Sequence, residues 1–304
     1  MQWRLAIHGG AGSMRPGRLD PEAEHKSRAG LAAALEAGAQ RLASGGSAVD
    51  AVEAAARALE EDLCFNAGRG SVLAADGHIE LDAAIMDGRT RRAGAVAGLR
   101  TTRAPISLAR QLMERGPHVF LAGTSADELA RSLGLEQVAN GWFATDERRR
   151  QLDELLASGG FDDEVKYGTI GAVAVDLNGH VAAATSTGGL TAKQWGRIGD
   201  SPLIGAGTYA DETAAISATG SGEYFIRAVA AHSVAARVRL AGVSLQQAVD
   251  EVLADIAELG GKGGLIAVAP SGDVAFGFTT PAMYRGVAGP DGSKVSVYSD
   301  SEER

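Results

Sequence analysis

The segment from residue 169 to residue 186 restricts the fold more than any other part of the sequence. Two runs rich in β-branched and small apolar residues, TIGAVAVD at 169–176 and HVAAATS at 180–186, are separated by Leu177-Asn178-Gly179. An Asn-Gly pair between two such runs is typical of a β-hairpin with a tight turn. The segment therefore predicts two neighbouring antiparallel strands.

The other elements predicted from periodicity alternate pairs of helices with groups of strands. Two helix starts are marked by Asp20-Pro21 and by the capping-box spacing of Ser47 and Asp50. We expect helices over 21–42, 47–59, 106–115, 125–133, 145–158, 222–240 and 245–259. We expect further strands over 3–7, 79–86, 93–99, 203–208, 214–219, 264–269 and 273–278. Because no strand–helix–strand crossover repeats, this order favours antiparallel or mixed sheets between helices, an α+β fold.

Glycine is unusually frequent, and a packed fold has to accommodate it. There are 41 glycines among 304 residues, about twice the ordinary share of roughly 7%. The chain has no Gly-X-Y period, only 8 prolines and 45% hydrophobic residues, which excludes collagen and a disordered chain. We therefore expect the glycines at turns and at close approaches of the backbone.

Charge and cysteine content exclude several classes of partner. The formal net charge of −9 has the wrong sign for a nucleic-acid surface, so no nucleic-acid partner is expected. The single cysteine, Cys64, cannot form an internal disulfide, and we expect a small core residue in a reducing compartment. Residues 1–7 are too short and polar for a signal sequence, and no apolar run reaches the about 18 residues of a membrane helix. We expect a soluble, cytoplasmic protein with no membrane partner.

Two glycine motifs are similar to known binding loops but lack the necessary context. GAGTYA at 205–210 matches a dinucleotide fingerprint, yet the next residues predict a turn and a strand instead of the helix that would bind pyrophosphate. HGGAG at 8–12 is similar to the oxyanion loop of lipases, but the chain has no G-x-S-x-G elbow. The 6 histidines show no zinc-ligand spacing. We interpret His8 as a buried, hydrogen-bonded residue that shapes its loop.

Threonines lie where the two strands of the predicted hairpin begin and end. Thr169 starts the first strand directly after Gly168, and Thr185 and Thr187 end the second. A threonine hydroxyl becomes a nucleophile when the chain is cut before it, because the freed α-amine, with a pKa of about 7.7–8.0, can act as general base. A preceding glycine tolerates the strained backbone that such a cut requires. From these residues alone, an ordinary β-branched strand residue remains the commoner explanation of Thr169.

Eight blocks of sequence resemble the plant-type asparaginase and isoaspartyl peptidase family of N-terminal-nucleophile hydrolases. In order they are IHGGAG at 7–12, FNAGRG at 65–70, ELDAAIMDG at 80–88, TIGAVAVDLNG at 169–179, AATSTGGLTAK at 183–193, GRIGDSPLIGAG at 196–207, ATGSGE at 218–223 and GGLIAV at 263–268. The resemblance implies one domain over 1–304 with the family's four-layer αββα sandwich. It implies self-cleavage between Gly168 and Thr169, giving an α subunit, 1–168, which ends in a predicted linker at 158–168, and a β subunit, 169–304.

The resemblance also implies the activity and the catalytic residues. The activity would be hydrolysis of β-aspartyl dipeptides and L-asparagine by a dimer of αβ heterodimers. Thr169 matches the nucleophile and Thr187 the threonine that hydrogen-bonds it. Thr219 and Gly220 match the pair that stabilises the oxyanion, and Asn66 matches an amide beside the active site. Each preorganised oxyanion donor is typically worth roughly 3–4 kcal/mol of the barrier.

By the same resemblance, Arg197 and Asp200 bind the α-carboxylate and the α-amine of the substrate. A guanidinium suits a carboxylate and a carboxylate suits an ammonium, although without the motif an exposed ion pair would be the simpler explanation. The implied substrate-binding residues are Arg197, Ile198, Gly199, Asp200, Thr219, Gly220, Ser221 and Gly222. Such a clamp selects small molecules with a free α-amino acid end and a scissile amide on the β-carboxyl.

The segment 59–69 resembles the sodium loop of the family, in which backbone carbonyls hold the ion. The implied ligands are the carbonyls of Leu59, Glu60, Asp62, Phe65, Ala67 and Arg69. Since carbonyl ligation leaves no side-chain signature, the alternative is an ordinary loop that ends a helix. Sodium would be structural, and no cofactor is expected for catalysis.

Two departures from the family pattern and two rival functions remain. One departure is the short stretch before Thr169, where the linkers of the family vary. Pro281-Ala282 precede Met283 where relatives more often have a glycine, so the geometry beside the pocket could differ. The first rival is a glycosylasparaginase, against which the lack of a signal sequence argues. The second is an uncut, non-catalytic protein that binds small amino-acid ligands.

Overall fold

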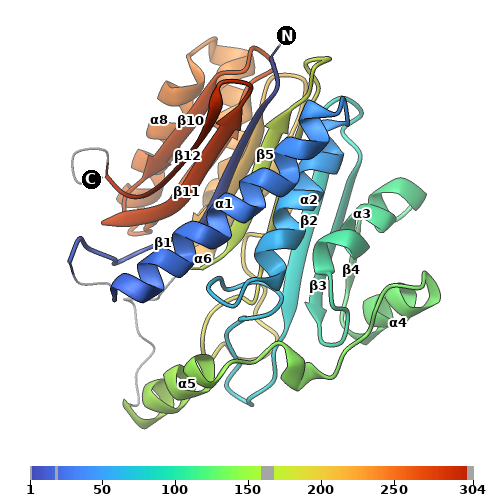
Figure 1. Ribbon diagram of the computed structural model, residues 1–304, viewed down its shortest axis with the longest axis vertical. Helices are drawn as coiled ribbons and strands as arrows, with labels where there is room; N and C mark the ends of the chain where they lie inside the picture. Colours follow the sequence, from blue (N-terminus) through green and yellow to red (C-terminus); the bar gives the residue numbers. More distant parts are fainter. Residues whose placement is uncertain (1, 18–19, 159–167, 300–304) are drawn as a thin grey trace.

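The computed structural model describes residues 2–17, 20–158 and 168–299, which form two β-sheets covered by helices (Figure 1). The larger sheet has the strand order β12-β11-β1-β5-β6-β2-β3-β4, and the smaller has the order β10-β9-β8-β7. The strand pairs are antiparallel except for β3 and β4, which are parallel. The predicted α+β fold with antiparallel or mixed sheets is confirmed.

The bounds of the elements are as follows. The larger sheet contains β1 Arg4–Gly12, β2 Leu81–Asp87, β3 Ala93–Leu99, β4 Phe120–Ala122, β5 Ile170–Val175, β6 Val181–Thr187, β11 Ala282–Gly289 and β12 Gly292–Tyr298. The smaller sheet contains β7 Thr208–Ala210, β8 Ala215–Gly220, β9 Gly263–Val268 and β10 Val274–Phe278. The helices are α1 Pro21–Ala43, α2 Ala48–Glu61, α3 Pro105–Arg115, α4 Thr124–Ser132, α5 Asp146–Ser158, α6 Gly222–Ala228, α7 Ala230–Ala236 and α8 Leu245–Glu258, with helical turns η1 Asn140–Trp142 and η2 Arg237–Ala241.

The two hydrophobic cores lie on opposite faces of the larger sheet. Helices α1, α2 and α3 pack on one face, and β8 and β9 of the smaller sheet contact β1, β5 and β6 on the other. Helices α7 and α8 pack against the smaller sheet. Strand β5 shows the alternation, because Ala172 and Ala174 belong to the core under the helices while Val173 and Val175 belong to the core between the sheets.

Local capping signals placed the helix starts correctly. The side chain of Asp20 accepts a hydrogen bond from the N–H of Ala23 at 3.2 Å, which starts α1. Ser47 and Asp50 form the predicted reciprocal capping box of α2. These interactions join residues three positions apart, so they could be recognised without tertiary information.

The predicted glycine loop at 8–12 is instead a continuation of β1. This strand pairs with β5 as far as His8 and with β11 as far as Gly12. A shift in register between His8 and Gly10, where Gly10 has φ +107°, accommodates the irregular glycine run. Pairing with β11 thus keeps in a strand a sequence that alone predicts a loop.

Two further predicted elements differ from the structure. The strand expected at 203–208 begins only at Thr208, because residues 203–207 form a turn; as predicted, no helix follows the GAGTYA motif. The helix expected at 222–240 breaks at Val229, which has φ +47°. The N–H groups at the start of α7 explain the break, since Ala231 and His232 donate to the carbonyls of Ala206 and Gly205.

Strands β4, β11 and β12 were not predicted. The turn between β11 and β12 contains Pro290-Asp291-Gly292, a pattern typical of a turn that could have revealed this hairpin.

Cys64 is half-buried against the core instead of inside it, and burial raises the pKa of its thiol to about 11. The predicted linker at 158–168 lies outside the described residues except at its two ends. Among the described helices, none has the length and apolar character required to span a membrane.

Candidate active site

Thr169 and Thr187 meet at one end of the β5–β6 hairpin. The antiparallel register, in which Ile170 faces Ser186, brings the start of β5 beside the end of β6. The Thr169 hydroxyl donates to the Thr187 hydroxyl at 3.0 Å, and the latter also accepts the N–H of Gly189 at 3.0 Å. The hairpin predicted from the sequence therefore brings the two threonines together.

A buried chain of polar side chains supports Thr169 from the core between the sheets. His8 is fully buried, and burial lowers its pKa to about 3, so the ring is neutral. Because a carbonyl can only accept, His8 Nδ1 donates to the Thr169 carbonyl at 3.0 Å, which leaves Nε2 to accept from Ser217 Oγ at 2.9 Å. The chain continues through Thr185 to Thr208, with oxygen–oxygen distances of 2.7 Å at both links. The interpretation of His8 as a buried, hydrogen-bonded residue is confirmed.

Asn66 links the predicted cut site to the loop that follows β6. Its backbone N–H donates to the Gly168 carbonyl at 3.1 Å, and its backbone carbonyl accepts from Gly188 at 3.1 Å. Its side-chain amide donates to the Gly189 carbonyl at 2.8 Å and accepts from the Val72 N–H at 2.9 Å. The structure thus directs the Asn66 side chain to neighbouring backbone groups, and it is the backbone N–H that faces the cut site.

Gly168 is required by a close contact with Asn66. A Cβ atom at this position would lie 2.6 Å from the Cβ of Asn66, which is far inside van der Waals contact. The absence of a side chain is therefore what lets the cut site approach Asn66.

Asp200 and Arg197 line the same cavity. They do not form with each other the exposed ion pair that would be the simpler explanation of these two residues in the sequence. Asp200 is 5% exposed, and its Oδ2 has no hydrogen-bond partner among the described residues. Burial raises its pKa to about 7; Arg197 opposes this shift, and the negative charges of Glu223 and Asp82 add to it. Arg197 donates instead to Glu223, from Nε at 2.8 Å and from Nη2 at 2.9 Å.

Thr219 and Gly220 end strand β8 beside these groups. Thr219 is fully buried, and within the described part of the chain its Oγ1 has no hydrogen-bond partner. Gly220 has φ +147°, and a Cβ there would lie 2.4 Å from the Lys262 carbonyl, so only glycine fits. The Ser221 hydroxyl accepts the N–H of Lys262 at 3.2 Å.

Helix α6 begins directly against the clamp formed by Arg197 and Asp200. A Cβ on Gly222 would lie 2.8 Å from Arg197 Nη2 and 2.9 Å from Asp200 Oδ1. Glu223 follows in the first turn of the helix, which explains how it reaches Arg197. Ile198 is half-buried in the loop between Arg197 and Asp200.

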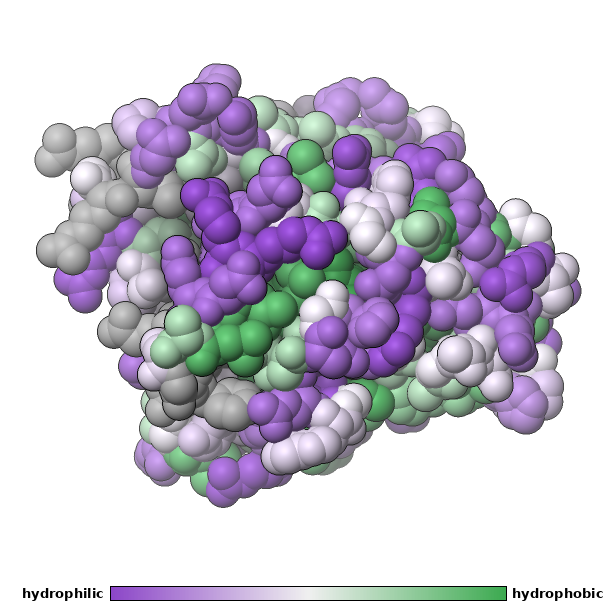
Figure 2. Space-filling model, turned by 90° about the horizontal axis from the view of Figure 1, so that it is seen from below, coloured by the Kyte–Doolittle hydropathy of each residue, from purple (hydrophilic) through white to green (hydrophobic). Residues whose placement is uncertain are grey.

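Seven of the predicted residues line a narrow cavity of about 10 Å³, enough for about one water molecule, whereas Asn66, Ile198, Thr219, Ser221 and Gly222 do not line it. It is lined by Gly168, Thr169, Thr187, Gly189, Leu190, Arg197, Gly199, Asp200, Ser201 and Gly220. Gly189, Leu190 and Ser201 were not predicted, nor was Glu223, although all four lie within the matched blocks. Figure 2 views the molecule from the side at which β1 ends and β5 begins, and hydrophobic residues are exposed there among hydrophilic ones. Ala282, part of one departure from the family pattern, lies outside this lining and pairs with Gly12 and Tyr298.

The loop after α2 folds tightly around its own carbonyl groups. A Cβ on Gly70 would lie 2.7 Å and 2.8 Å from the carbonyl oxygens of Leu63 and Phe65, and one on Gly68 would lie 2.4 Å from that of Glu60. The Glu60 carbonyl already accepts the N–H of Arg69 at 2.7 Å, but a carbonyl oxygen has a second lone pair. The carbonyl oxygens of Leu63 and Phe65 thus converge on one point, as the oxygen donors of a hard cation do, although Leu63 is not among the implied ligands.

Comparisons with known proteins identify the family of this chain. Residues 1–297 match the family described as "Asparaginase". The "Isoaspartyl peptidase" of Escherichia coli (strain K12) is 45% identical over 309 residues, covering 97% of this chain and 96% of that protein. The "Probable isoaspartyl peptidase/L-asparaginase 2" of Arabidopsis thaliana is 42% identical, covering 95% and 97%, and the "Isoaspartyl peptidase/L-asparaginase" of Rattus norvegicus is 43% identical, covering 92% and 84%. The chain therefore belongs to the asparaginase family, as the eight sequence blocks predicted.

Proposed function

We propose that this chain cuts itself before Thr169 and then uses that threonine to hydrolyse β-aspartyl dipeptides and L-asparagine, releasing L-aspartate. One observation carries the proposal. Asp200 Oδ2 and Thr219 Oγ1 are buried and lack partners among the described residues, and Asp200 and Gly220, the residue after Thr219, line the same cavity as Thr169 and Thr187. A buried polar atom without a partner costs free energy, so these atoms are suited to a polar ligand.

Self-cleavage would use the contacts around the peptide bond between Gly168 and Thr169. The Thr169 hydroxyl oxygen attacks the Gly168 carbonyl carbon, and the backbone N–H of Asn66, 3.1 Å from that carbonyl oxygen, stabilises the developing negative charge. The C–N bond breaks as the hydroxyl proton is transferred to the Thr169 nitrogen, and an ester forms between Gly168 and the Thr169 oxygen. Water then hydrolyses the ester, leaving a carboxylate on Gly168 and a free α-amine on Thr169.

Substrate hydrolysis would repeat this chemistry on a small molecule. The Thr169 amine takes the hydroxyl proton, the oxygen attacks the side-chain carbonyl carbon of the substrate, and Thr219 and Gly220 stabilise the oxyanion. The amine or ammonia leaves with a proton, which gives a β-aspartyl ester on Thr169. Water hydrolyses the ester, and L-aspartate is released.

The clamp supports the choice of substrate. Arg197 would bind the α-carboxylate with the donors that Glu223 does not engage, and ionised Asp200 would accept from the α-ammonium. Both β-aspartyl dipeptides and L-asparagine present these two groups and differ only in the leaving group. The names of the relatives support the same pair of substrates.

The family also supports an architecture and an assembly for the chain. The packing of helices and sheets described above is consistent with a single four-layer αββα domain, which the cut would divide into residues 1–168 and 169–304. We propose that two such αβ units pair. We further propose that the carbonyls of Leu59, Glu60, Asp62, Phe65, Ala67 and Arg69 hold a structural sodium ion, while Thr169 and its neighbours carry out the reaction.

A denaturing gel followed by N-terminal sequencing tests the proposal. The expected result is two bands, with Thr169 as the new N-terminus and activity on both substrates. Thr169→Ala should give one uncut, inactive chain, whereas the control Thr191→Ala should be cut and active. One intact band after prolonged incubation would leave the non-catalytic rival, and faster hydrolysis of glycosylasparagine than of either substrate would favour the glycosylasparaginase rival.

A further inference from the structure

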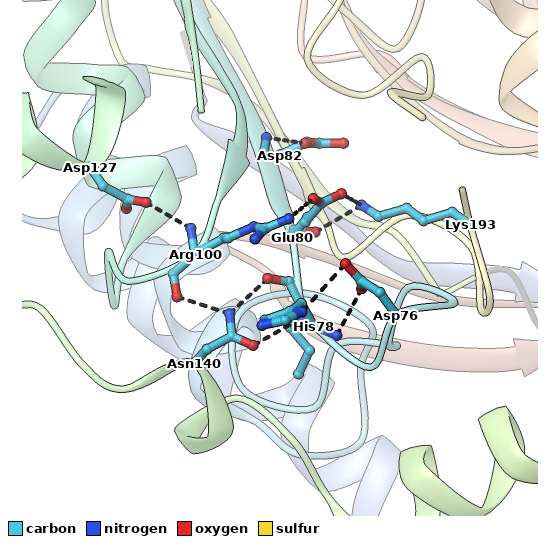
Figure 3. A network of polar contacts seen from close by, with 10 residues as sticks. Asp76, His78, Glu80, Asp82, Arg100, Asp127, Asn140 and Lys193 are labelled. Carbon is cyan, nitrogen blue, oxygen red and sulfur yellow. Dashed lines mark hydrogen bonds and ion pairs between the residues drawn. The ribbon is translucent and has the colours of Figure 1, made fainter. Parts of the chain in front are cut away.

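Lys193 holds a buried ammonium group just outside the candidate active site. Its side chain is 1% exposed, and Nζ donates to the Glu80 carbonyl at 3.0 Å while lying 3.8 Å from Glu80 Oε2. Arg100 Nη2 donates to the other Glu80 oxygen at 2.7 Å, so the carboxylate is fixed between two cations (Figure 3). Burial of an ammonium costs several kcal/mol in desolvation, and a neutral side chain would avoid that cost.

The Lys193 side chain touches the residue that orients Thr187. A Cβ on Gly189 would lie 3.0 Å from Lys193 Nζ and 3.1 Å from its Cδ, and the φ of +83° also favours glycine there. The Gly189 N–H donates to Thr187 Oγ1 at 3.0 Å, and its carbonyl accepts from the Asn66 side chain at 2.8 Å. A shift of Lys193 would therefore act on Thr187 through a single residue.

Strand β2 provides a second connection between Lys193 and Thr187. Glu80 directly precedes β2, and Asp82, two residues on, is paired with Thr187. Residues opposed in this way point to the same face of a sheet, with Cβ atoms about 4.5–5.5 Å apart. Asp82 is 1% exposed and accepts from the Gly98 N–H at 2.8 Å, and the charge of Lys193 partly offsets the effect of burial on its pKa. The Lys193 ammonium thus contacts Glu80, which leads into β2, and Gly189, in the loop after β6, and both segments flank Thr187.

We propose that Lys193 is a positioning residue for the Thr169–Thr187 pair, because its ammonium, anchored on Glu80, holds Gly189 with its N–H on the Thr187 hydroxyl. The inference rests on the proposed function, since it concerns how the partner of the nucleophile is held. Without this restraint the Thr187 hydroxyl can turn away from Thr169. A misplacement of about 1 Å in a reacting group can reduce the rate by about a hundredfold.

The test compares Lys193→Met, which keeps most of the stem and removes the charge, with the wild type. Rates are normalised to the amount of chain carrying Thr169 as N-terminus. We expect kcat for L-asparagine to fall by about ten- to a hundredfold while KM changes by less than about threefold, since Arg197 and Asp200 keep their own contacts. Lys193→Arg, which returns a cation beside Glu80, should recover most of kcat.

A matched control separates positioning from a general loss of stability. Arg110 binds the carboxylates of Asp50, Glu53 and Glu114 at 2.6–2.8 Å, at the N-terminal end of α2 and on α3. Arg110→Met should therefore lower the unfolding temperature without lowering kcat per cut chain. An unchanged kcat in Lys193→Met, or an equal loss in Arg110→Met, would overturn the inference.

Slow cutting of Lys193→Met, or its failure to fold, would also test the role of Lys193. If Lys193→Met folds but is cut too little for kcat to be measured, and more than about tenfold more slowly than Arg110→Met, the inference is supported, because Thr187 orients Thr169 in both reactions. If Lys193→Met does not fold, Glu80→Gln removes the anchoring charge and should lower kcat with KM unchanged; wild-type kcat in that variant would refute the role. An inactive wild type would instead refute the proposed function.

Discussion

Arg197 and Glu223 form a two-pronged ion pair, with Nε to Oε1 at 2.8 Å and Nη2 to Oε2 at 2.9 Å, beside the buried carboxyl of Asp200. The negative charge of Glu223 helps to raise the pKa of Asp200, and the positive charge of Arg197 lowers it. The charge of Glu223 is therefore coupled to the protonation of Asp200, the group that we propose as the acceptor of the substrate ammonium.

Glu223→Gln should extend activity to lower pH. The substitution removes a charge that raises the pKa of Asp200 and leaves the opposing charge of Arg197, so Asp200 stays ionised at lower pH. The acidic limb of the kcat/KM profile, which reports groups of the free enzyme, should move from near pH 7 to lower pH. Glu251→Gln, at the distant Arg237 ion pair, is the control and should not move the limb. An unshifted limb in Glu223→Gln would contradict the coupling.

Asp200→Asn should stabilise the fold while weakening substrate binding. The carboxyl has a pKa of about 7 when folded and 3.8 otherwise, so the folded state binds its proton more tightly. The free energy of unfolding of the wild type therefore falls as pH rises from about 4 to about 7. The full decrease due to Asp200, on the order of 4 kcal/mol, is present above pH 7. The variant avoids this decrease, so its denaturant midpoint should exceed that of the wild type at pH 8 and match it near pH 3.

The same variant should lose affinity, because it lacks a charged acceptor for the α-ammonium. We expect KM for L-asparagine to rise by about ten- to a hundredfold. Ser201→Ala, at the next position in the cavity lining, serves as the control. A variant that is less stable than the wild type at pH 8, or that keeps its KM, would show that Asp200 is a structural residue.

Gly168→Ala should slow self-cleavage strongly. The added methyl group would lie 2.6 Å from the Cβ of Asn66 and would push the Gly168 carbonyl away from the Asn66 N–H. Loss of one oxyanion donor typically costs about a hundred- to a thousandfold in rate. The rate is measured as conversion to two bands on a denaturing gel over time. Conversion of Gly168→Ala at the wild-type rate would exclude a role for this contact.

Sodium should raise the unfolding temperature selectively. A ligand that binds only the folded state stabilises it by about 2.7 kcal/mol at a hundred times its Kd. We expect a higher unfolding temperature in sodium chloride than in choline chloride of equal concentration. In Gly70→Ala, where the methyl group would lie 2.7 Å and 2.8 Å from two loop carbonyls, the difference should disappear. Equal unfolding temperatures of the wild type in both salts would refute the ion.

The parts of the fold that the sequence predicted are those whose determinants are local. The Asn-Gly turn brings Thr169 to Thr187, although they are 18 positions apart, because a hairpin aligns its own two strands. The break at Val229 could not be predicted, since its cause is the contact of α7 with residues 205–206. Strands β11 and β12 were missed although the turn signal between them is local, and the burial of β11 does not alternate with a period of two.

The candidate site divides in the same way. Sequence blocks identified Arg197 and Asp200, but the burial of Asp200 and the pairing of Arg197 with Glu223, 26 positions away, depend on how α6 packs against the loop. The anchoring of Lys193 on Glu80 spans 113 positions and has no local signal. Spacing along a chain identifies residue types, whereas partners across the fold follow from packing.

The strand order of the larger sheet has a consequence for the molecule after the proposed cut. Strand β1, from the segment before Thr169, lies between β11 and β5, both from the segment after it, and β6 lies against β2. The two products would be interleaved, so separating them requires breaking three β-ladders at once. The two products should therefore elute together as one species from a size-exclusion column. Their combined mass should exceed that of the intact chain by one water molecule. Once the two chains are pulled apart by denaturation, refolding would require a bimolecular encounter, so processing would make unfolding harder to reverse.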